Sequence, residues 1–142
     1  MERTENEKKK EYLRRYQDSV RTQKAIIEEI RQLRIDTMMP SANTDGMPHG
    51  TGTSDLSSYA AKKDELIRKL NREMKRKLEI QIDITHRIDN MKSETEALVL
   101  RLRYIHGMKW EEIAVKMGYE YRNILYIHGK ALTHFVLPEN FA

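Results

Sequence analysis

The chain has 142 residues, enough for one domain or for one domain with an extension. Charged residues make up 34% and hydrophobic residues 39%, and 26 Lys and Arg against 22 Asp and Glu give a formal charge of +4. This composition favours long, solvated helices around a modest core and argues against a sheet-rich enzyme. The absence of cysteine excludes a disulfide framework, a thiolate metal site and a Cys nucleophile.

The first two predicted elements are long helices joined by a loop. In residues 1–39 apolar side chains recur at three-, four- and seven-residue steps, on a stripe formed by Tyr12, Tyr16, Val20, Ile27, Ile30 and Leu33. Residues 40–53 lack any periodicity and predict a flexible Gly/Pro-rich loop. Residues 54–92 predict the second helix, with a stripe of Leu66, Leu70, Met74, Leu78, Ile82, Ile88 and Met91. We expect an antiparallel hairpin with the two stripes in contact.

Residues 93–137 predict a compact unit of short helices, followed by a tail at 138–142. A capping box at Ser93 to Glu96 begins the first of these helices, which ends at the glycine of His106-Gly107. The second runs from Trp110 to Met117, with Trp110 in the core, and ends at Gly118. The third runs from Tyr121 to about Val136. Two helices separated by a glycine turn, after a third helix, favour a helix-turn-helix.

The faces of the last helix can be separated by the 100° rotation per residue. The side predicted to be buried carries Ile124, Ile127, His128, Ala131 and Phe135. The outward stripe carries side chains that can donate to phosphates, and Arg and Asn can also read purine edges. The candidate DNA-contacting residues are Arg122, Asn123, Tyr126, Lys130 and Thr133 on this stripe, together with Tyr121. We expect Arg122 to read a base and Lys130 to hold a phosphate.

The run from Leu100 through Trp110-Glu-Glu-Ile-Ala114, Met117-Gly-Tyr119 and Tyr126-Ile-His-Gly-Lys-Ala-Leu132 resembles region four of bacterial sigma factors. It is similar above all to small phage regulators of the ArpU and RinA type, in which a charged helix and a Gly/Pro-rich loop precede a sigma-like end. The segment Lys10 to Tyr16 also resembles them. The resemblance implies a DNA-binding transcription regulator of late or packaging and lysis genes in a phage or prophage.

The charge distribution is not the one expected if the C-terminal helices alone bound DNA. Residues 94–142 contain six Lys or Arg and six Asp or Glu, whereas residues 62–77 contain eight and three, a net charge of +5. Nonspecific DNA affinity depends on neutralised phosphates. We therefore expect further phosphate contacts outside the last helix, from Lys62, Lys63, Arg68, Lys69, Arg72, Arg76 and Lys109. Lys109 also stands at the start of its helix, where relatives place Ser or Thr and where a positive charge opposes the helix dipole.

Several alternatives remain open at this stage. A DNA-packaging recognition subunit of a phage and a helical protein-interaction scaffold would both suit the same elements. The long helices could pair with a second copy of the chain or contact RNA polymerase. We expect no enzymatic activity, cofactor or metal, since no nucleophile, phosphate loop or metal spacing is present. The charged N-terminal segment and the lack of any run near ~18 apolar residues predict a cytoplasmic protein without membrane contact.

Overall fold

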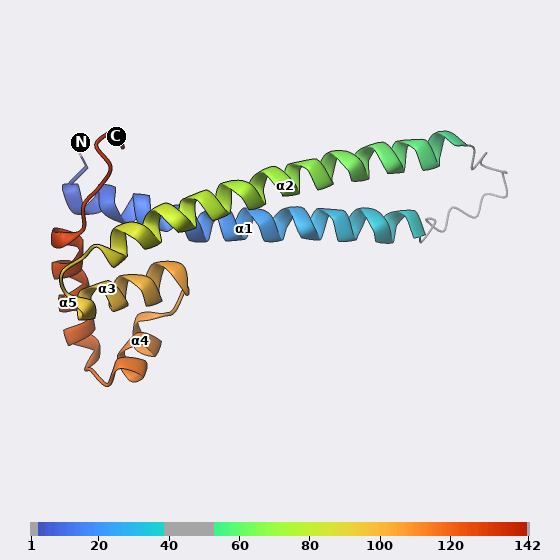
Figure 1. The fold of residues 1–142 in the computed structure, drawn as a ribbon. Coiled ribbons are helices and arrows are strands. Elements are labelled where there is room, and N and C mark those ends of the chain that lie inside the picture. Colours follow the sequence, from blue (N-terminus) through green and yellow to red (C-terminus); the bar gives the residue numbers. More distant parts are fainter. Residues whose placement is uncertain (1–2, 39–52, 142) are drawn as a thin grey trace. The chain divides into compact units, whose positions relative to one another are not determined.

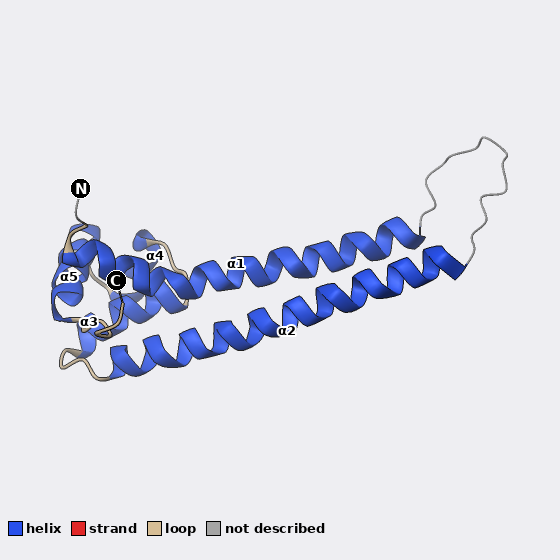
Figure 2. Ribbon diagram, turned by 90° about the horizontal axis from the view of Figure 1, so that it is seen from above, coloured by secondary structure: helices blue, strands red, loops and turns tan. Residues whose placement is uncertain are grey.

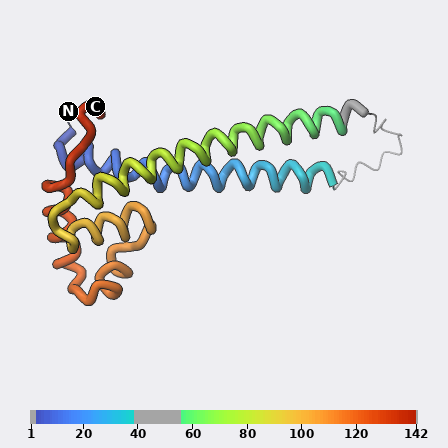
Figure 3. Tube along the Cα trace, viewed as in Figure 1, coloured from blue at the N-terminus to red at the C-terminus, as the bar shows by residue number. Residues whose placement is uncertain are grey.

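The computed structural model describes residues 3–38 and 53–141, and every regular element in these ranges is helical. The fold class is therefore all-α, as predicted. The elements, in the order traced in Figures 1 and 3, are α1 (Glu5–Met38), α2 (Thr53–Asp89), α3 (Glu94–Leu100), the π-helical turn η1 (Arg101–Ile105), α4 (Trp110–Met117) and α5 (Tyr121–His134). Except for Thr53, the loop predicted at 40–53 lies outside the described residues. No described helix is both long and apolar enough to cross a bilayer.

The chain divides into two compact units, and each long helix contributes to both. Unit 1 comprises Met1–Ser19 and Lys77–Ala142, and unit 2 comprises Val20–Arg76. The unit boundaries thus fall inside α1 and α2. The boundaries lie there because one end of each long helix packs against the short C-terminal helices and completes their core.

One core of unit 1 joins the long helices to the short ones. Tyr12 and Leu13 from α1 pack with apolar side chains of every other element of the unit except α4. These partners are Ile80, Ile84, Ile88, Leu100, Tyr104, Ala131, Leu132 and Phe135, all at most 8% exposed. Burying an aliphatic or aromatic side chain of this size contributes about 1.5 to 3 kcal/mol, so this cluster stabilises unit 1 strongly.

A second core of unit 1 holds the three short helices together. Val99 from α3, Leu102 from η1, Ile113 and Ala114 from α4, and Ile124 from α5 form its buried centre. The side chains packed around this centre are Met108, Trp110, Met117 and Ile127. Trp110 is partly buried there, which confirms its assignment to the core.

Unit 2 consists, in its described part, of the second half of α1 and the first half of α2. These segments run antiparallel and side by side in both views of Figures 1 and 2. Ile26 is buried at 2% exposure, while Ile30 and Leu33 of α1 and Leu66 and Leu70 of α2 are partly buried. The helical pair expected from the two stripes is therefore present.

The buried face of each long helix differs in part from the predicted stripe. In α2, Met74, Leu78 and Ile82 are 45%, 54% and 61% exposed, and the buried positions are Ile80, Ile84 and Ile88. A stripe built from four-residue steps turns by about 40° per step, so it rotates away from a straight partner.

In α1 the predicted apolar stripe differs from the buried face at one position. There Ile26 is buried and Ile27 is 46% exposed. The partly buried positions of α1 and α2 instead alternate three- and four-residue steps, which keeps them on one side of the helix.

The start of α3 confirms half of the predicted capping box. The Ser93 hydroxyl accepts from the backbone N–H of Glu96 at 3.2 Å. The Glu96 carboxylate does not reach back to residue 93, and it contacts Nδ1 of His134 at the end of α5. This side chain therefore links α3 to α5. The helix then widens into η1, where His106 N–H donates to Arg101 O at 3.1 Å, before the left-handed Gly107 ends it.

Candidate nucleic-acid interface

The junction between α4 and α5 is a tight turn centred on a left-handed glycine. Gly118 has φ 73° and ψ 29°, a conformation that costs L-residues with a side chain about 1 to 2 kcal/mol. The N–H groups of Gly118 and Tyr119 donate to Val115 O and Ala114 O at 3.3 and 3.0 Å. These bonds satisfy the last carbonyls of α4, so α5 begins after a fixed reversal of the chain.

Neither helix of this pair has a side-chain cap at its start. Lys109 and Glu120 precede α4 and α5 in extended conformation, and neither side chain accepts from the helix. Lys109 therefore provides no side-chain cap for α4. The first turn of α4 contains Glu111 and Glu112, which offset the dipole there. The position of α5 consequently depends on packing more than on capping.

The outward stripe of α5 has the exposure that the helical period predicts. Every candidate residue on it is exposed: Arg122, Asn123, Tyr126, Lys130, Thr133 and, in the first turn, Tyr121. The Lys130 ammonium lies 5.3 Å from the centroid of the Tyr126 ring, a cation–π contact that keeps both side chains over the same turn. The Thr133 hydroxyl donates to Gly129 O at 3.1 Å, so towards another molecule it can act only as a hydrogen-bond acceptor.

Apolar side chains are also exposed on α4, on α5 and in the turn between them. Tyr126 is 64% exposed, and Val115 of α4 is 83% exposed. Tyr119, Tyr121 and Leu125 are each between 38% and 44% exposed around the same turn. The surface formed by the turn and by α5 is thus a mixture of the cations Arg122 and Lys130, the Glu120 carboxylate, the Asn123 amide and several apolar groups.

The opposite side of α5 is anchored by a stack of side chains. Ile124, Ala131 and Leu132 are nearly inaccessible, and His128 is 8% exposed. The His128 ring lies 4.4 Å from the Trp110 ring, and its Nε2 lies 2.8 Å from the Tyr104 hydroxyl. His128 therefore lies on the buried side, as predicted, and its hydrogen-bond partner is a tyrosine.

Electrostatics keeps this buried histidine neutral. Burial, together with the smaller effect of the positive charges of Lys10, Arg103 and Arg14, lowers the pKa of His128 from 6.5 to about 4. Sequence reasoning missed these three cations, because they come from α1 and η1 and no local pattern connects them with His128. The signal that was present in the sequence is the four-residue spacing of Lys10 and Arg14 on one helix face.

The basic residues predicted in α2 form a separate set in unit 2. The six side chains are all exposed: Lys62, Lys63, Arg68, Lys69, Arg72 and Arg76. Arg68 Nε lies 3.0 Å from Asp64 Oδ2, and Lys63 Nζ lies 5.8 Å from the centroid of the Tyr59 ring. The seventh predicted contact, Lys109, is exposed in unit 1, directly before α4.

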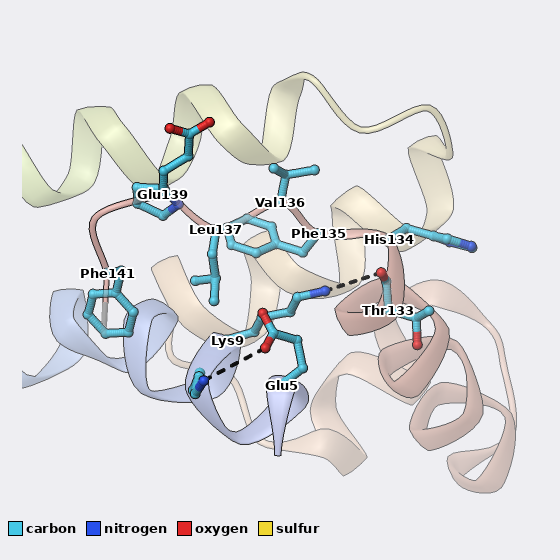
Figure 4. Close-up of a pocket in the computed structure, with 11 residues that line it drawn as sticks. Glu5, Lys9, Thr133, His134, Phe135, Val136, Leu137, Glu139 and Phe141 are labelled. Carbon is cyan, nitrogen blue, oxygen red and sulfur yellow. Dashed lines mark hydrogen bonds and ion pairs between the residues drawn. The ribbon is translucent and has the colours of Figure 1, made fainter. Parts of the chain in front are cut away.

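The end of α5 is held by a lysine from α1. Lys9 is 8% exposed, and its ammonium donates to Leu132 O at 2.8 Å and to Thr133 O at 3.2 Å. It lies beside a groove of about 460 Å³ between the first turns of α1 and the segment 133–141 (Figure 4). A cation at these carbonyls satisfies acceptors that the helix itself leaves unpaired.

The described residues offer no group of three or more His, Asp or Glu side chains placed to hold a metal ion. Comparisons of the chain with protein-family models, with curated proteins and with solved structures give no match in any of the three.

Proposed function

We propose that this protein binds double-stranded DNA through α5 and regulates transcription, with α3, η1, α4 and α5 forming a helix-turn-helix unit like region four of sigma factors. The observation that supports this most is the exposed stripe of Arg122, Asn123 and Lys130 on a helix whose opposite face is buried. An α-helix fits the major groove, where arginine and asparagine can form paired hydrogen bonds with guanine and adenine. The fixed turn at Gly118 suits this role, since a reading helix must be presented rigidly.

The roles within the stripe follow from side-chain chemistry. Arg122 lies in the first turn of α5, the part of a recognition helix that contacts base edges. Lys130 lies two turns later, where a flexible ammonium can reach a phosphate. We therefore assign base reading to Arg122 and Asn123, and backbone contact to Lys130.

Selection from a randomised duplex library at low salt tests the proposal. We expect a recovered sequence motif for the full-length chain. Arg122→Ala is expected to lose about 1 to 3 kcal/mol on that motif and to relax the preference at one position. Lys130→Ala is expected to weaken all sequences alike and to reduce the salt slope of log K by about 0.9. Lys92→Ala, which removes an exposed charge between α2 and α3, is the control. Unchanged affinity in both α5 variants would refute the assignment.

A second candidate function is a protein-interaction scaffold. The strong exposure of Val115 and Tyr126 favours it, because such apolar groups are also typical of surfaces that bind another protein. This candidate would be preferred if the folded chain bound no duplex of any sequence at low salt.

A further inference from the structure

A glycine lies on the outward side of α5 at a position where the fold does not require one. Gly129 follows Tyr126 by three residues and precedes Thr133 by four, so the helical period places all three on one side of α5. Among the described residues only Gly107 and Gly118 have positive φ, so the backbone of Gly129 is one that any residue adopts. A Cβ at Gly129 would meet no atom within 4 Å beyond its own stretch of helix.

Glycine also weakens the helix in which it lies. It loses more conformational freedom on folding than alanine does, and in a helix interior only proline is less favourable. Gly129 lies in the interior of the 14-residue α5 and is partly exposed. A residue that lowers helix stability and relieves no crowding within the chain suits a place where another molecule comes close to the helix.

The side chains beside Gly129 offer an apolar surface. Tyr126 is 64% exposed, and the Lys130 ammonium lies over its ring. The Thr133 hydroxyl gives its hydrogen to Gly129 O, so it cannot donate to a phosphate, whereas its methyl group makes no hydrogen bond. We refer to the open place over Gly129, between Tyr126 and Thr133, as the Gly129 gap. An apolar group fits these surroundings better than an anion does.

We propose that the Gly129 gap takes the C5-methyl group of a thymine in the major groove. This inference rests on the proposed function, because it takes α5 as the element in that groove. Thymine is the base that presents a methyl group there, and aromatic rings and threonine methyl groups are typical contacts of it.

The position of this thymine follows from the helix rise. Gly129 lies seven residues after Arg122, which is about 10 Å along α5. Successive base pairs are about 3.4 Å apart. The thymine should therefore lie within about three base pairs of the one that Arg122 reads, which is the position whose preference Arg122→Ala relaxes.

Exchange of thymine for deoxyuridine tests the proposal, because it removes the methyl group and keeps the base pairing. The probe is the duplex selected by the full-length chain, in which each thymine within about three base pairs of that position is exchanged in turn. We expect one exchange to weaken binding about fourfold, the effect of one buried apolar group of this size. An exchange outside the selected site should leave the affinity unchanged.

Two variants assign the methyl contact to the Gly129 gap. Gly129→Ala places a methyl group on the protein, so it should bind the thymine duplex more weakly than the deoxyuridine duplex, the reverse of the wild type. Its thermal midpoint should nevertheless rise by about 2 to 4 °C, because alanine favours the helix. Tyr126→Ala should bind both duplexes equally. Tyr119→Ala, which removes an exposed tyrosine of the turn, should keep the fourfold difference and is the matched control.

The outcomes separate the two proposals. If no exchange weakens the wild type while Arg122→Ala still does, the gap takes no methyl group and the function proposed for α5 stands. The inference is also overturned if Tyr126→Ala and Gly129→Ala keep the wild-type preference for thymine, because the methyl group is then read elsewhere. If the wild-type chain binds no duplex at low salt, both proposals fail. Circular dichroism of each variant verifies that the fold is intact.

Discussion

The Tyr104 hydroxyl lies 2.8 Å from Nε2 of His128 and joins η1 to the buried side of α5. Burial raises the pKa of Tyr104 to about 12, with Arg14 and Arg103 opposing the shift, and burial also holds the pKa of His128 near 4. Both side chains are therefore uncharged at neutral pH, and the phenol can donate to the imidazole. The pair fixes the side of α5 that is turned away from the proposed DNA.

Acid is expected to destabilise the protein through His128. Its pKa is about 4 in the folded chain and about 6.5 when unfolded, so the unfolded state binds more protons between these values. The stabilising contribution is complete above about pH 6.5 and is lost as the pH falls toward 4. At pH 5 we expect a loss of about 2 kcal/mol in the free energy of unfolding.

Urea unfolding at pH 7.5 and pH 5 measures this loss. His128→Gln should be less stable than the wild type at both pH values. Its free energy of unfolding should, however, differ between pH 7.5 and pH 5 by about 2 kcal/mol less than that of the wild type. An equal pH dependence in the variant would place the acid sensitivity at another group.

Tyr104→Phe should destabilise unit 1 without changing its shape. The substitution keeps the buried ring but leaves Nε2 of His128 without its partner, and a buried polar group left unpaired costs about 1 to 3 kcal/mol. The measurement is the urea midpoint at neutral pH, with Tyr59→Phe as a matched control on the partly buried surface of α2. A Tyr104→Phe midpoint equal to that of the control would mean that the hydroxyl contributes nothing.

Substitution by alanine should destabilise the protein by different amounts at the two left-handed glycines. Gly107 and Gly118 have φ of 68° and 73°, so each substitution costs about 1 to 2 kcal/mol in backbone strain. At Gly118 the added Cβ meets open space, but at Gly107 it lies 3.2 Å from Oε1 of Gln17. The Gln17 amide would have to shift by a few tenths of an ångström, which disturbs its two bonds to η1. Gly107→Ala should therefore cost more than Gly118→Ala.

A double-mutant cycle isolates the steric part of this difference. In a Gln17→Ala background the penalty of Gly107→Ala should fall to that of Gly118→Ala. An unchanged penalty would attribute the whole effect to the backbone.

Removing the Lys9 ammonium should weaken the link between α1 and α5. Lys9→Met keeps the apolar stem but leaves two carbonyls at the helix end without the donor, at a cost of about 2 kcal/mol. Thermal unfolding of Lys9→Met and of the neighbouring Lys8→Met, whose exposed ion pair with Glu5 contributes less than about 1 kcal/mol, gives the comparison. Equal midpoints would show that the carbonyls are satisfied by water.

Part of the candidate interface could be predicted from the sequence, because it lies within a single helix. The period of 3.6 residues separates Arg122 and Lys130 from Ile124 and Ala131 without knowledge of the partner elements. The three cations that act on His128, namely Lys10, Arg14 and Arg103, could not be predicted in this way. Arg14 and Arg103 are 89 positions apart in the sequence, and their proximity depends on how α1 packs against η1.

The sequence by itself determined the all-α class, the ends of the short helices and the exposed stripe of α5, because capping, left-handed glycine and helical period are local properties. Only the tertiary structure decided which face of α2 is buried, since Ile80 and Ile84 compete with Leu78 and Ile82 for the partner helix and their hydropathy is alike. It also decided the partners of Lys9 and His128. Such contacts join residues far apart in the chain, and they form only when the whole core of unit 1 is assembled.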